Sequence, residues 1–279
     1  MKKVKDLVSV IISTKNSSKT LVRCLNSIID QSYRQIEILI IDNNSSDNTK
    51  VISKKYNIKV FNHGFERSSQ RNFGAKLAKG NYLYFVDSDF ILNKKVITEC
   101  IYKIKDYDAI VVHNSPDIRI SWIAKIRKFE VDMYKYDLTY SAARFFKKNV
   151  FFDIGGYNEK LIAGEDYDLQ NKLNKKEYKT GFIESENLHI GEPRSLLKHM
   201  LKYYYYGKDF VNYKEYNNLE SKKQLSFIRL PYLKNWKKFI FHPGLGICFL
   251  CYHTIKFIFG GLGYFSVKFL FKIKKYSQK

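Results

Sequence analysis

The sequence predicts an α/β protein with a mainly parallel sheet and helices on both faces, followed by a basic, hydrophobic, membrane-associating segment. Short apolar runs rich in β-branched residues alternate with amphipathic stretches over the first ninety residues, a pattern typical of strand–helix–strand units. Each apolar run ends in polar side chains. The 279 residues are 45% hydrophobic and 16% aromatic, which supplies a packed core and excludes a disordered chain.

The expected elements follow from the position of each apolar run. A basic N-terminus precedes the first run, which is too short for a signal-peptide core. The next runs alternate with a helix from about residue 19 and another over 68–79, which ends at Gly80. The first half is therefore predicted to contain strands at 8–12, 36–41, 58–61 and 82–86. The second half is predicted to contain a strand at 109–113, a helix at 121–134, a strand and turn at 141–156, and a helix from 165.

Polar clusters follow three of the predicted strands. They lie at residues 13–14, 42–47 and 87–89. Because ligands bind outside the carboxyl ends of parallel strands, these clusters are expected to surround one crevice.

Two acidic clusters have the composition of a catalytic site. Asp87 and Asp89 are separated by one residue, and Mg²⁺ commonly shares a carboxylate or two with substrate phosphates. The alternative is a solvated turn or a helix cap. Glu165, Asp166 and Asp168 stand at a helix start, where they either complement the helix dipole or supply a general base. Arg71 lies in a predicted helix that begins with small residues, and its N-terminus suits an anion or a base carbonyl. The alternative is a surface helix with solvated arginines.

Taken together, the segments resemble family 2 glycosyltransferases of the GT-A fold. The resemblance covers roughly residues 6–190. It rests on residues 8–16 (VSVIISTKN), 27–32, 37–46 (EILIIDNNSS), 71–74 (RNFG), 87–89 (DSD), 155–159 (GGYNE) and 165–166 (ED).

The resemblance implies a nucleotide-binding role for the strand ends. Ser13 and Thr14 correspond to residues that line the base. Asp42 matches the acid that pairs with the base or ribose, with Asn44 and Ser45 beside it, and Arg71 matches a nucleotide-contacting arginine. Lys15 replaces an aromatic residue of some relatives.

The resemblance also implies a metal site and a base. Asp87 and Asp89 match the carboxylates that hold the ribose and a Mn²⁺ or Mg²⁺ ion on the diphosphate. Asp166 matches the catalytic base, with Glu165 beside it, and His189 matches a further metal or phosphate contact or is a plain loop histidine. The expected enzyme is a metal-dependent, inverting glycosyltransferase (EC 2.4 type) whose donor is a nucleotide sugar, with a UDP-sugar favoured.

The positive charge is concentrated in the last third of the chain. Of a net charge of +22, residues 191–279 contribute +13, from 17 Lys+Arg and 4 Asp+Glu. Residues 239–255 contain no charged side chain except histidine, and Lys256 follows them. A single span would place Lys256 near mid-bilayer, and Pro243 and five glycines argue against one straight helix. An interfacial or re-entrant hydrophobic pair is therefore favoured, with a span or a buried helical core as alternatives.

This distribution predicts two regions and a membrane location. A catalytic domain is expected over residues 1–193, and a basic helical region over 194–279, with its hydrophobic segment at about 239–271. Residues 268–279 contain five lysines that would contact anionic lipid, with the catalytic domain on the cytoplasmic side. A lipid-linked or membrane-presented acceptor would suit this arrangement.

Two other functions remain as alternatives. A nucleic-acid-binding protein would explain the charge and the four tyrosines at 203–206, but leaves the acidic strand ends unexplained. A sugar-nucleotidyltransferase would need a glycine-rich loop after the first strand, which the sequence lacks. Cys248 and Cys251 have CxxC spacing without a second pair, so we expect buried thiols rather than a zinc site.

Overall fold

The computed structural model describes residues 6–276, and their side chains up to residue 269. The chain forms two compact units. The first contains residues up to 115 together with 141–159 and 169–191, and the second contains 116–140, 160–168 and the chain from 192 onward. The predicted division at residue 193/194 stays a prediction.

A seven-stranded sheet forms the centre of the first unit, in the order β3-β2-β1-β4-β8-β6-β9. All neighbouring pairs are parallel except those that involve β8, which is antiparallel to β4 and to β6. The strands are β1 (Val8–Thr14), β2 (Ile36–Asp42), β3 (Val60–Asn62), β4 (Tyr82–Asp87), β6 (Ala109–Val111), β8 (Phe145–Lys147) and β9 (Thr180–Phe182). The predicted α/β class with a mostly parallel sheet is confirmed.

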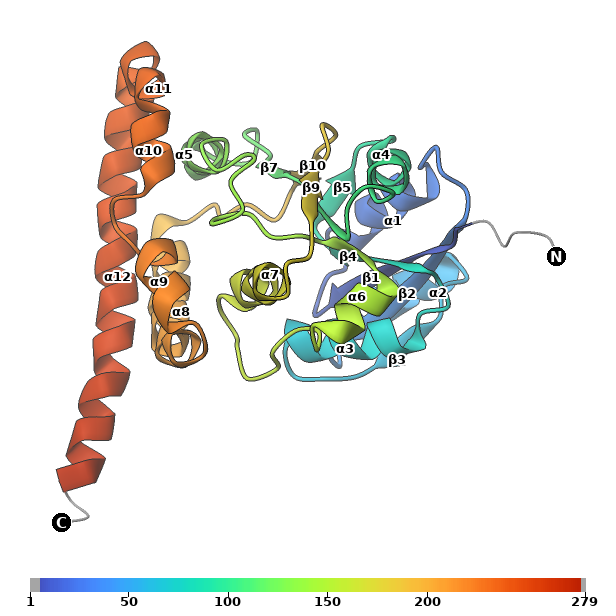
Figure 1. Cartoon of the computed structure of the whole chain (residues 1–279), viewed down its shortest axis with the longest axis horizontal. Helices are drawn as coiled ribbons and strands as arrows, with labels where there is room; N and C mark the ends of the chain where they lie inside the picture. The colour runs from blue at the N-terminus through green and yellow to red at the C-terminus, as the bar shows by residue number, and fades with distance from the viewer. Residues whose placement is uncertain (1–5, 277–279) are drawn as a thin grey trace. The chain divides into compact units, whose positions relative to one another are not determined.

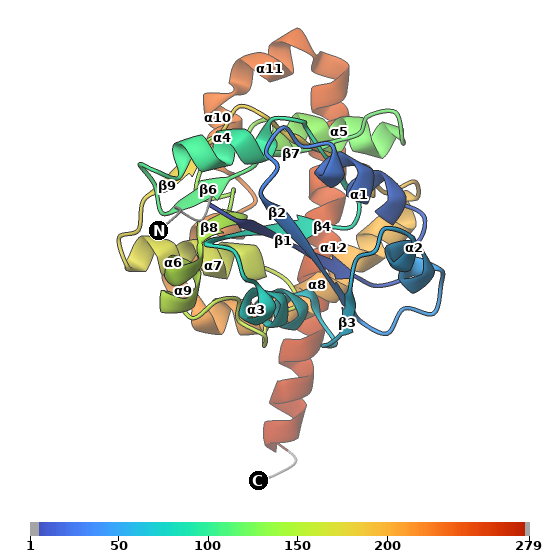
Figure 2. The same cartoon turned by 90° about the vertical axis from the view of Figure 1, so that its right-hand side faces the viewer.

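Helices cover both faces of this sheet (Figure 1). The helices α1 (Leu21–Ile29) and α4 (Val96–Lys103) lie on one face, and α3 (Arg67–Leu77) packs against β1 and β2 on the other (Figure 2). The short helix α2 (Thr49–Lys55) connects β2 to β3. In α1 the buried residues recur every three or four positions, so one apolar stripe faces the core.

A small three-stranded sheet, in the order β5-β10-β7, joins distant parts of the chain. Its strands are β5 (Phe90–Leu92), β7 (Asn114–Pro116) and β10 (Asn187–His189). The antiparallel pairing of β5 with β10 sets Phe90 opposite His189. Residues 87–89, which immediately precede β5, therefore lie close to the end of β10.

The second unit is helical. The helix α7 (Glu165–Lys175) begins in it and continues into the first unit. The other helices are α5 (Trp122–Val131), α8 (Leu196–Tyr216), α9 (Asn218–Gln224), α10 (Leu230–Lys234), α11 (Trp236–Phe241) and α12 (Pro243–Tyr276). Its apolar core is formed by α5, α8, α10 and α12, with Phe129 and Phe249 among the buried side chains.

One predicted element of the first unit is partly wrong. The apolar run at 145–152 forms β8 and then a helix, α6 (Lys148–Asp153), where a strand and turn were expected. Phe151 is buried from this helix, with its ring 4.9 Å from that of Phe85. A short apolar run fits a buried strand and a buried helix equally well, so periodicity does not separate the two.

The C-terminal hydrophobic segment is one continuous helix of 34 residues, which corrects the expected interrupted pair. Pro243 is the first residue of α12, where a missing N–H breaks no helical hydrogen bond. The glycines allow close contact with α8, since a Cβ on Gly263 would lie 2.0 Å from the carbonyl oxygen of Tyr204. Lys256 is buried, and its Nζ lies 2.5 Å from Glu130 Oε1 on α5.

The expected burial of Cys248 and Cys251 is also wrong, because both thiols are exposed. The buried stripe of α12 passes through Phe249, Tyr252 and Lys256, at spacings of three and four residues. Neither cysteine lies on that stripe. The predicted lipid contact of residues 270–279 lies outside the described side chains.

Candidate functional site

The carboxyl ends of β1, β2 and β4 bring the first predicted site residues together. In the register of the sheet, Ser13 is paired with Asp87 and with Ile41, and Thr14 is paired with Asp42. Parallel strands that start in register end at one edge, so these polar groups share that edge.

Asp42 is fully buried and binds the loop that follows β2. Its carboxylate accepts hydrogen bonds from Thr14 Oγ1 at 2.7 Å, and from the backbone N–H and hydroxyl of Ser45 at 2.7 and 2.5 Å. Lys50 Nζ lies 3.7 Å away. Asn44, at the turn of this loop, is exposed and has a φ of 47°. Both carboxylate oxygens thus position the loop that carries Asn44 and Ser45.

Gln70 belongs to the same edge, and the sequence did not indicate it. Its Nε2 donates to the carbonyl oxygens of Thr14 and Ile41, at 3.0 and 2.6 Å. Gln70 is buried in α3 and joins that helix to the ends of β1 and β2. A glutamine in a polar helix start looks like a surface residue, so no sequence pattern separates it from its neighbours.

Two arginines bind Asp87, one at each oxygen of its carboxylate. Arg71 Nη2 lies 2.7 Å from Asp87 Oδ1, and Arg144 Nη1 lies 3.2 Å from Asp87 Oδ2. Burial raises the pKa of the Asp87 carboxyl, but Arg144 and Arg71 outweigh it and hold that pKa well below its usual range. Asp87 is therefore a charged group that fixes two guanidinium groups at the strand ends.

Arg144 is a second residue that sequence reasoning missed. It precedes β8, which reaches β4 only through the antiparallel pairing. Its backbone N–H donates to Ile110, and its carbonyl accepts from Phe85. No local motif surrounds it, so only the sheet topology reveals that Arg144 lies beside Asp87.

The GGYNE segment contacts α3 next to Arg71. Asn72 exchanges two 2.9 Å hydrogen bonds with the backbone of Tyr157 and donates a third to Glu159. The guanidinium carbon of Arg71 lies 5.0 Å from the centroid of the Tyr157 ring. Two segments that are 85 residues apart thus form one cluster that buries Arg71.

Asp89 and His189 form the candidate metal pair. Asp89 Oδ2 lies 3.2 Å from His189 Nε2, and the two side chains are 32% and 21% exposed. A Cβ on Gly191 would lie 1.9 Å from Asp89 Oδ2, so only glycine leaves room for the carboxylate in this position. The described residues contain no group of three or more His, Cys, Asp or Glu arranged to hold a metal. The Asp89 carboxylate nevertheless suits a Mn²⁺ or Mg²⁺ ion that takes its other ligands from phosphates and water, and the His189 imidazole favours Mn²⁺ over the harder Mg²⁺.

The second unit carries the predicted base. Glu165 and Asp166 open α7, with Glu165 buried and Asp166 partly exposed. Asp166 is therefore the more accessible of the two carboxylates. Gly164, which precedes Glu165, has a φ of 81°, a backbone conformation that favours glycine and shapes the turn into the helix.

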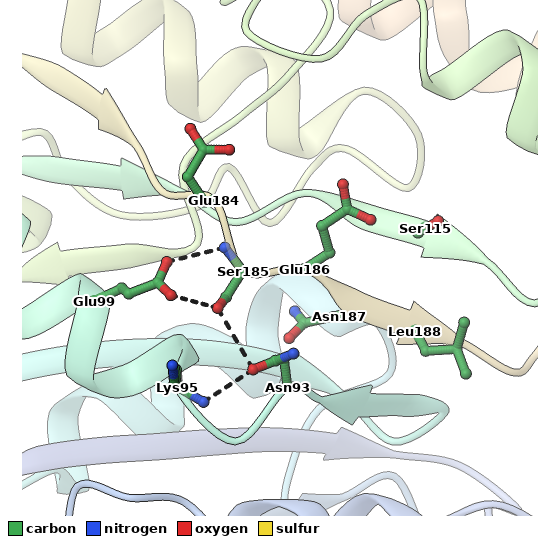
Figure 3. A pocket seen from close by; sticks show the side chains of 9 residues that line it. All are labelled: Asn93, Lys95, Glu99, Ser115, Glu184, Ser185, Glu186, Asn187 and Leu188. Atoms are coloured by element: carbon green, nitrogen blue, oxygen red, sulfur yellow. Dashed lines mark hydrogen bonds between the residues drawn. The ribbon is translucent and has the colours of Figure 1, made fainter.

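A groove of about 620 Å³ lies in the first unit, and none of the predicted site residues lines it (Figure 3). It is lined by Asn93, Lys95, Glu99, Ser115, Glu184, Ser185, Glu186, Asn187 and Leu188. Glu99 accepts hydrogen bonds from the backbone N–H and hydroxyl of Ser185, at 2.9 and 2.5 Å. These contacts join α4 to the chain that enters β10.

The family model for glycosyl transferase family 2 matches residues 9–158 of the chain. The chain belongs to glycosyl transferase family 2. The match begins in β1 and ends in the GGYNE segment, so it includes the strand ends and both arginines that contact Asp87.

Family 2 relatives match over part of their length. The chain is 32% identical to the glycosyltransferase GlyG of Streptococcus pneumoniae over 38% of each chain. It is 36% identical to WfaP of Escherichia coli, a UDP-Glc:alpha-D-GlcNAc-diphosphoundecaprenol beta-1,3-glucosyltransferase, over 30% of this chain and 36% of the relative. The matched regions thus span well under half of these relatives.

The structural alignment with a solved protein covers more of this chain than the sequence alignments with these relatives do. The mannosyltransferase PcManGT of Pyrobaculum calidifontis, solved with GDP-Man and Mn²⁺, aligns with a TM-score of 0.63 at 12% identity. The alignment covers 90% of this family 2 chain and 86% of PcManGT. The predicted GT-A fold is confirmed.

Proposed function

We propose that the protein transfers a sugar from a UDP-sugar to a hydroxyl group, with inversion at the anomeric carbon and with Mn²⁺ or Mg²⁺ as cofactor. The observation that carries this proposal is the group of side chains at the carboxyl end of β4. Arg71 of α3 and Arg144, just before β8, bind Asp87 there, and Asp89 Oδ2 lies 3.2 Å from His189 Nε2 of β10. WfaP, whose name specifies UDP-Glc, supports the donor, and PcManGT, solved with Mn²⁺, supports the metal.

The nucleotide is assigned to the ends of β1 and β2. Ser13 and Thr14 would line the base, and the Asp42 loop with Asn44 and Ser45 would contact the base or ribose. Asp42 already binds Thr14 and Ser45, so it presents these groups as one rigid surface. Arg71 is buried against Asp87, and it would support the strand ends that line the nucleotide.

The metal is assigned to Asp89, with His189 as a second ligand. The oxygens of Asp87 already contact Arg71 and Arg144, so Asp87 contributes to the same site chiefly through those arginines. A divalent cation here would neutralise the negative charge that builds on the departing diphosphate.

Asp166 is assigned as the general base. An acceptor hydroxyl is a weak nucleophile, and removal of its proton in the transition state assists attack on the anomeric carbon. The new glycosidic bond forms as the bond to the diphosphate breaks, and Asp166 takes the proton. A single displacement of this kind inverts the anomeric centre. Glu165, its neighbour in the sequence, is buried.

We also propose that the second unit binds an anionic membrane surface from the cytoplasmic side. Exposed apolar side chains follow one another along α10, α11 and α12, including Trp236, Ile240 and Phe241, with lysines between them. The helix α12 is the one described helix long and apolar enough to cross a bilayer. It packs along α8, which carries several lysines, and this favours a position in the interface over a span. A lipid-linked acceptor, such as the one in the name of WfaP, suits this location.

Replacement of Asp89 by Ala is expected to weaken Mn²⁺-dependent UDP binding by at least about 100-fold, because it removes the only carboxylate assigned to the metal. Calorimetric titration of UDP with and without Mn²⁺ measures this loss. The matched control is Asp106→Ala, an exposed aspartate of the same unit. Equal Mn²⁺ dependence in Asp89→Ala and wild type would contradict the metal assignment.

A donor panel of nucleotide sugars, scored by nucleotide release with a membrane lipid extract, tests the transfer itself.

The pair of substitutions Ile240→Glu and Phe241→Glu is expected to reduce flotation on anionic vesicles by about tenfold or more. Both side chains are over 60% exposed. A glutamate at either position does not insert into the lipid, which costs about 1.5–3 kcal/mol of apolar burial for each side chain. The vesicles contain phosphatidylglycerol and phosphatidylcholine, with pure phosphatidylcholine as reference. Tyr102→Glu, at an exposed position of the first unit, is the control. Flotation that is unchanged in the double variant, or salt-sensitive retention on DNA that exceeds lipid binding, would refute the membrane assignment.

A further inference from the structure

The helix α8 contacts different parts of the second unit on opposite sides. Gly207 lies against α12, where a Cβ would approach the carbonyl oxygen of Gly260 to 2.0 Å. Asp209 is two residues further on, which is about 200° around a helix of 3.6 residues per turn. The side that carries Asp209 contacts residues 162–168, the segment that includes Glu165 and Asp166.

Asp209 binds the backbone immediately before Glu165. Its Oδ2 accepts hydrogen bonds from the N–H groups of Ile162 and Ala163, at 2.7 and 2.9 Å. Its Oδ1 accepts from Asn212 Nδ2 at 2.8 Å. Asp209 is only 6% exposed, and hydrogen bonds from backbone N–H groups to a carboxylate are stronger than neutral ones. The path of the chain into α7 is therefore fixed by a side chain of α8.

Tyr213, one helical turn after Asp209, contacts Gly164, the residue that follows Ala163. A Cβ on Gly164 would lie 2.8 Å from Cδ2 of the Tyr213 ring. Tyr213 is itself fully buried, and its hydroxyl donates to Gln224 of α9. The turn at Gly164 thus rests directly on a buried ring that is also hydrogen-bonded to α9.

Asn217, at the C-terminal end of α8, binds the segment on the other side of Asp166. Its Nδ2 donates to Asp168 Oδ1 at 2.8 Å, and both residues are buried. Contacts from α8 therefore precede and follow Asp166 in the sequence, at 162–164 and at 168.

We infer that Asp209, Tyr213 and Asn217 are positioning residues that hold the Asp166 carboxylate in its working position. The inference rests on the proposed function, in which Asp166 is the base. The three residues lie outside the segment that matches the family model, so the C-terminal region of this chain supplies them. A shift of about 1 Å in a reacting group can lower turnover about 100-fold, so loss of these contacts is expected to act on kcat.

The test compares Asp209→Ala with Glu215→Ala, which removes an exposed carboxylate from the same helix. Hydrogen exchange of the peptide that contains residues 160–168, UDP affinity, and kcat and KM for the donor are measured on the full chain. Asp209→Ala is expected to speed exchange of this peptide and to lower kcat about 100-fold, with UDP affinity and donor KM within twofold of wild type. Asp209→Asn retains an acceptor oxygen and is expected to restore kcat to within about tenfold of wild type. Glu215→Ala is expected to match wild type.

Asn217→Ala provides a second variant that keeps the Asp209 contacts, in case Asp209→Ala fails to fold. Faster exchange with unchanged kcat, or equal loss of UDP affinity and kcat, would overturn the inference. If the wild type releases no nucleotide from any donor, the proposed function fails separately. The exchange rates then still decide whether α8 holds the segment, and equal rates in wild type and the variants would overturn that part too.

Discussion

Replacement of Asp166 by Asn is expected to lower kcat by about 10²–10⁴-fold, the usual contribution of a general base. The amide is nearly the same size as the carboxylate but has no basic oxygen, so it cannot take the proton of the acceptor hydroxyl. UDP affinity is expected to stay within twofold of wild type, because the nucleotide is assigned to the first unit. The change therefore separates chemistry from donor binding.

The measurement is steady-state nucleotide release with acceptor present, together with calorimetric titration of UDP. Glu165→Gln is the comparison variant, because Glu165 is the adjacent carboxylate and is buried, whereas Asp166 is partly exposed. Near-wild-type turnover in Asp166→Asn would exclude this residue as the base. A loss in Glu165→Gln that exceeds the loss in Asp166→Asn would transfer the role to Glu165.

The sheet and its polar edge could be predicted because the relevant signals are local. Each of β1, β2 and β4 is a short apolar run followed directly by polar residues, and parallel pairing then places Ser13, Asp42 and Asp87 at one edge. Gln70 and Arg144 could not be predicted, because their roles depend on contacts made across the sheet. The sequence shows which strand a residue follows. It does not show which distant strand lies beside that residue in the fold.

The C-terminal helix shows a second limit of sequence reasoning. Pro243, the glycines and Lys256 each argue against a long straight helix when considered alone. In the structure Pro243 is the first helical residue, Gly260 and Gly263 contact α8, and Lys256 pairs with Glu130. The same residues that would interrupt an isolated helix are those that pack it against its neighbours.

The ion pair of Glu130 and Lys256 carries the second large prediction. Glu130 is 5% exposed and also accepts a hydrogen bond from the Tyr134 hydroxyl at 3.0 Å. Burial raises the pKa of Glu130, but Lys256 and Arg229 outweigh it and lower that pKa to about 2. Glu130→Gln would leave the Lys256 ammonium buried without its carboxylate. The free energy of unfolding is expected to fall by about 3–5 kcal/mol, the usual effect of removing one partner of a buried pair.

Urea unfolding followed by tryptophan fluorescence measures this loss within the second unit, because both tryptophans of the chain, Trp122 and Trp236, belong to it. The control is Asp132→Asn, which removes the same charge from a partly exposed pair with Lys128, where about 0–1 kcal/mol is expected. The sign of the pH dependence follows from the lowered pKa of Glu130. Its stabilising effect is complete above the ordinary value of 4.5 and is lost as pH falls toward about 2. The difference between wild type and Glu130→Gln should therefore shrink over that interval, and a constant difference would show that Glu130 acts through packing rather than through its charge.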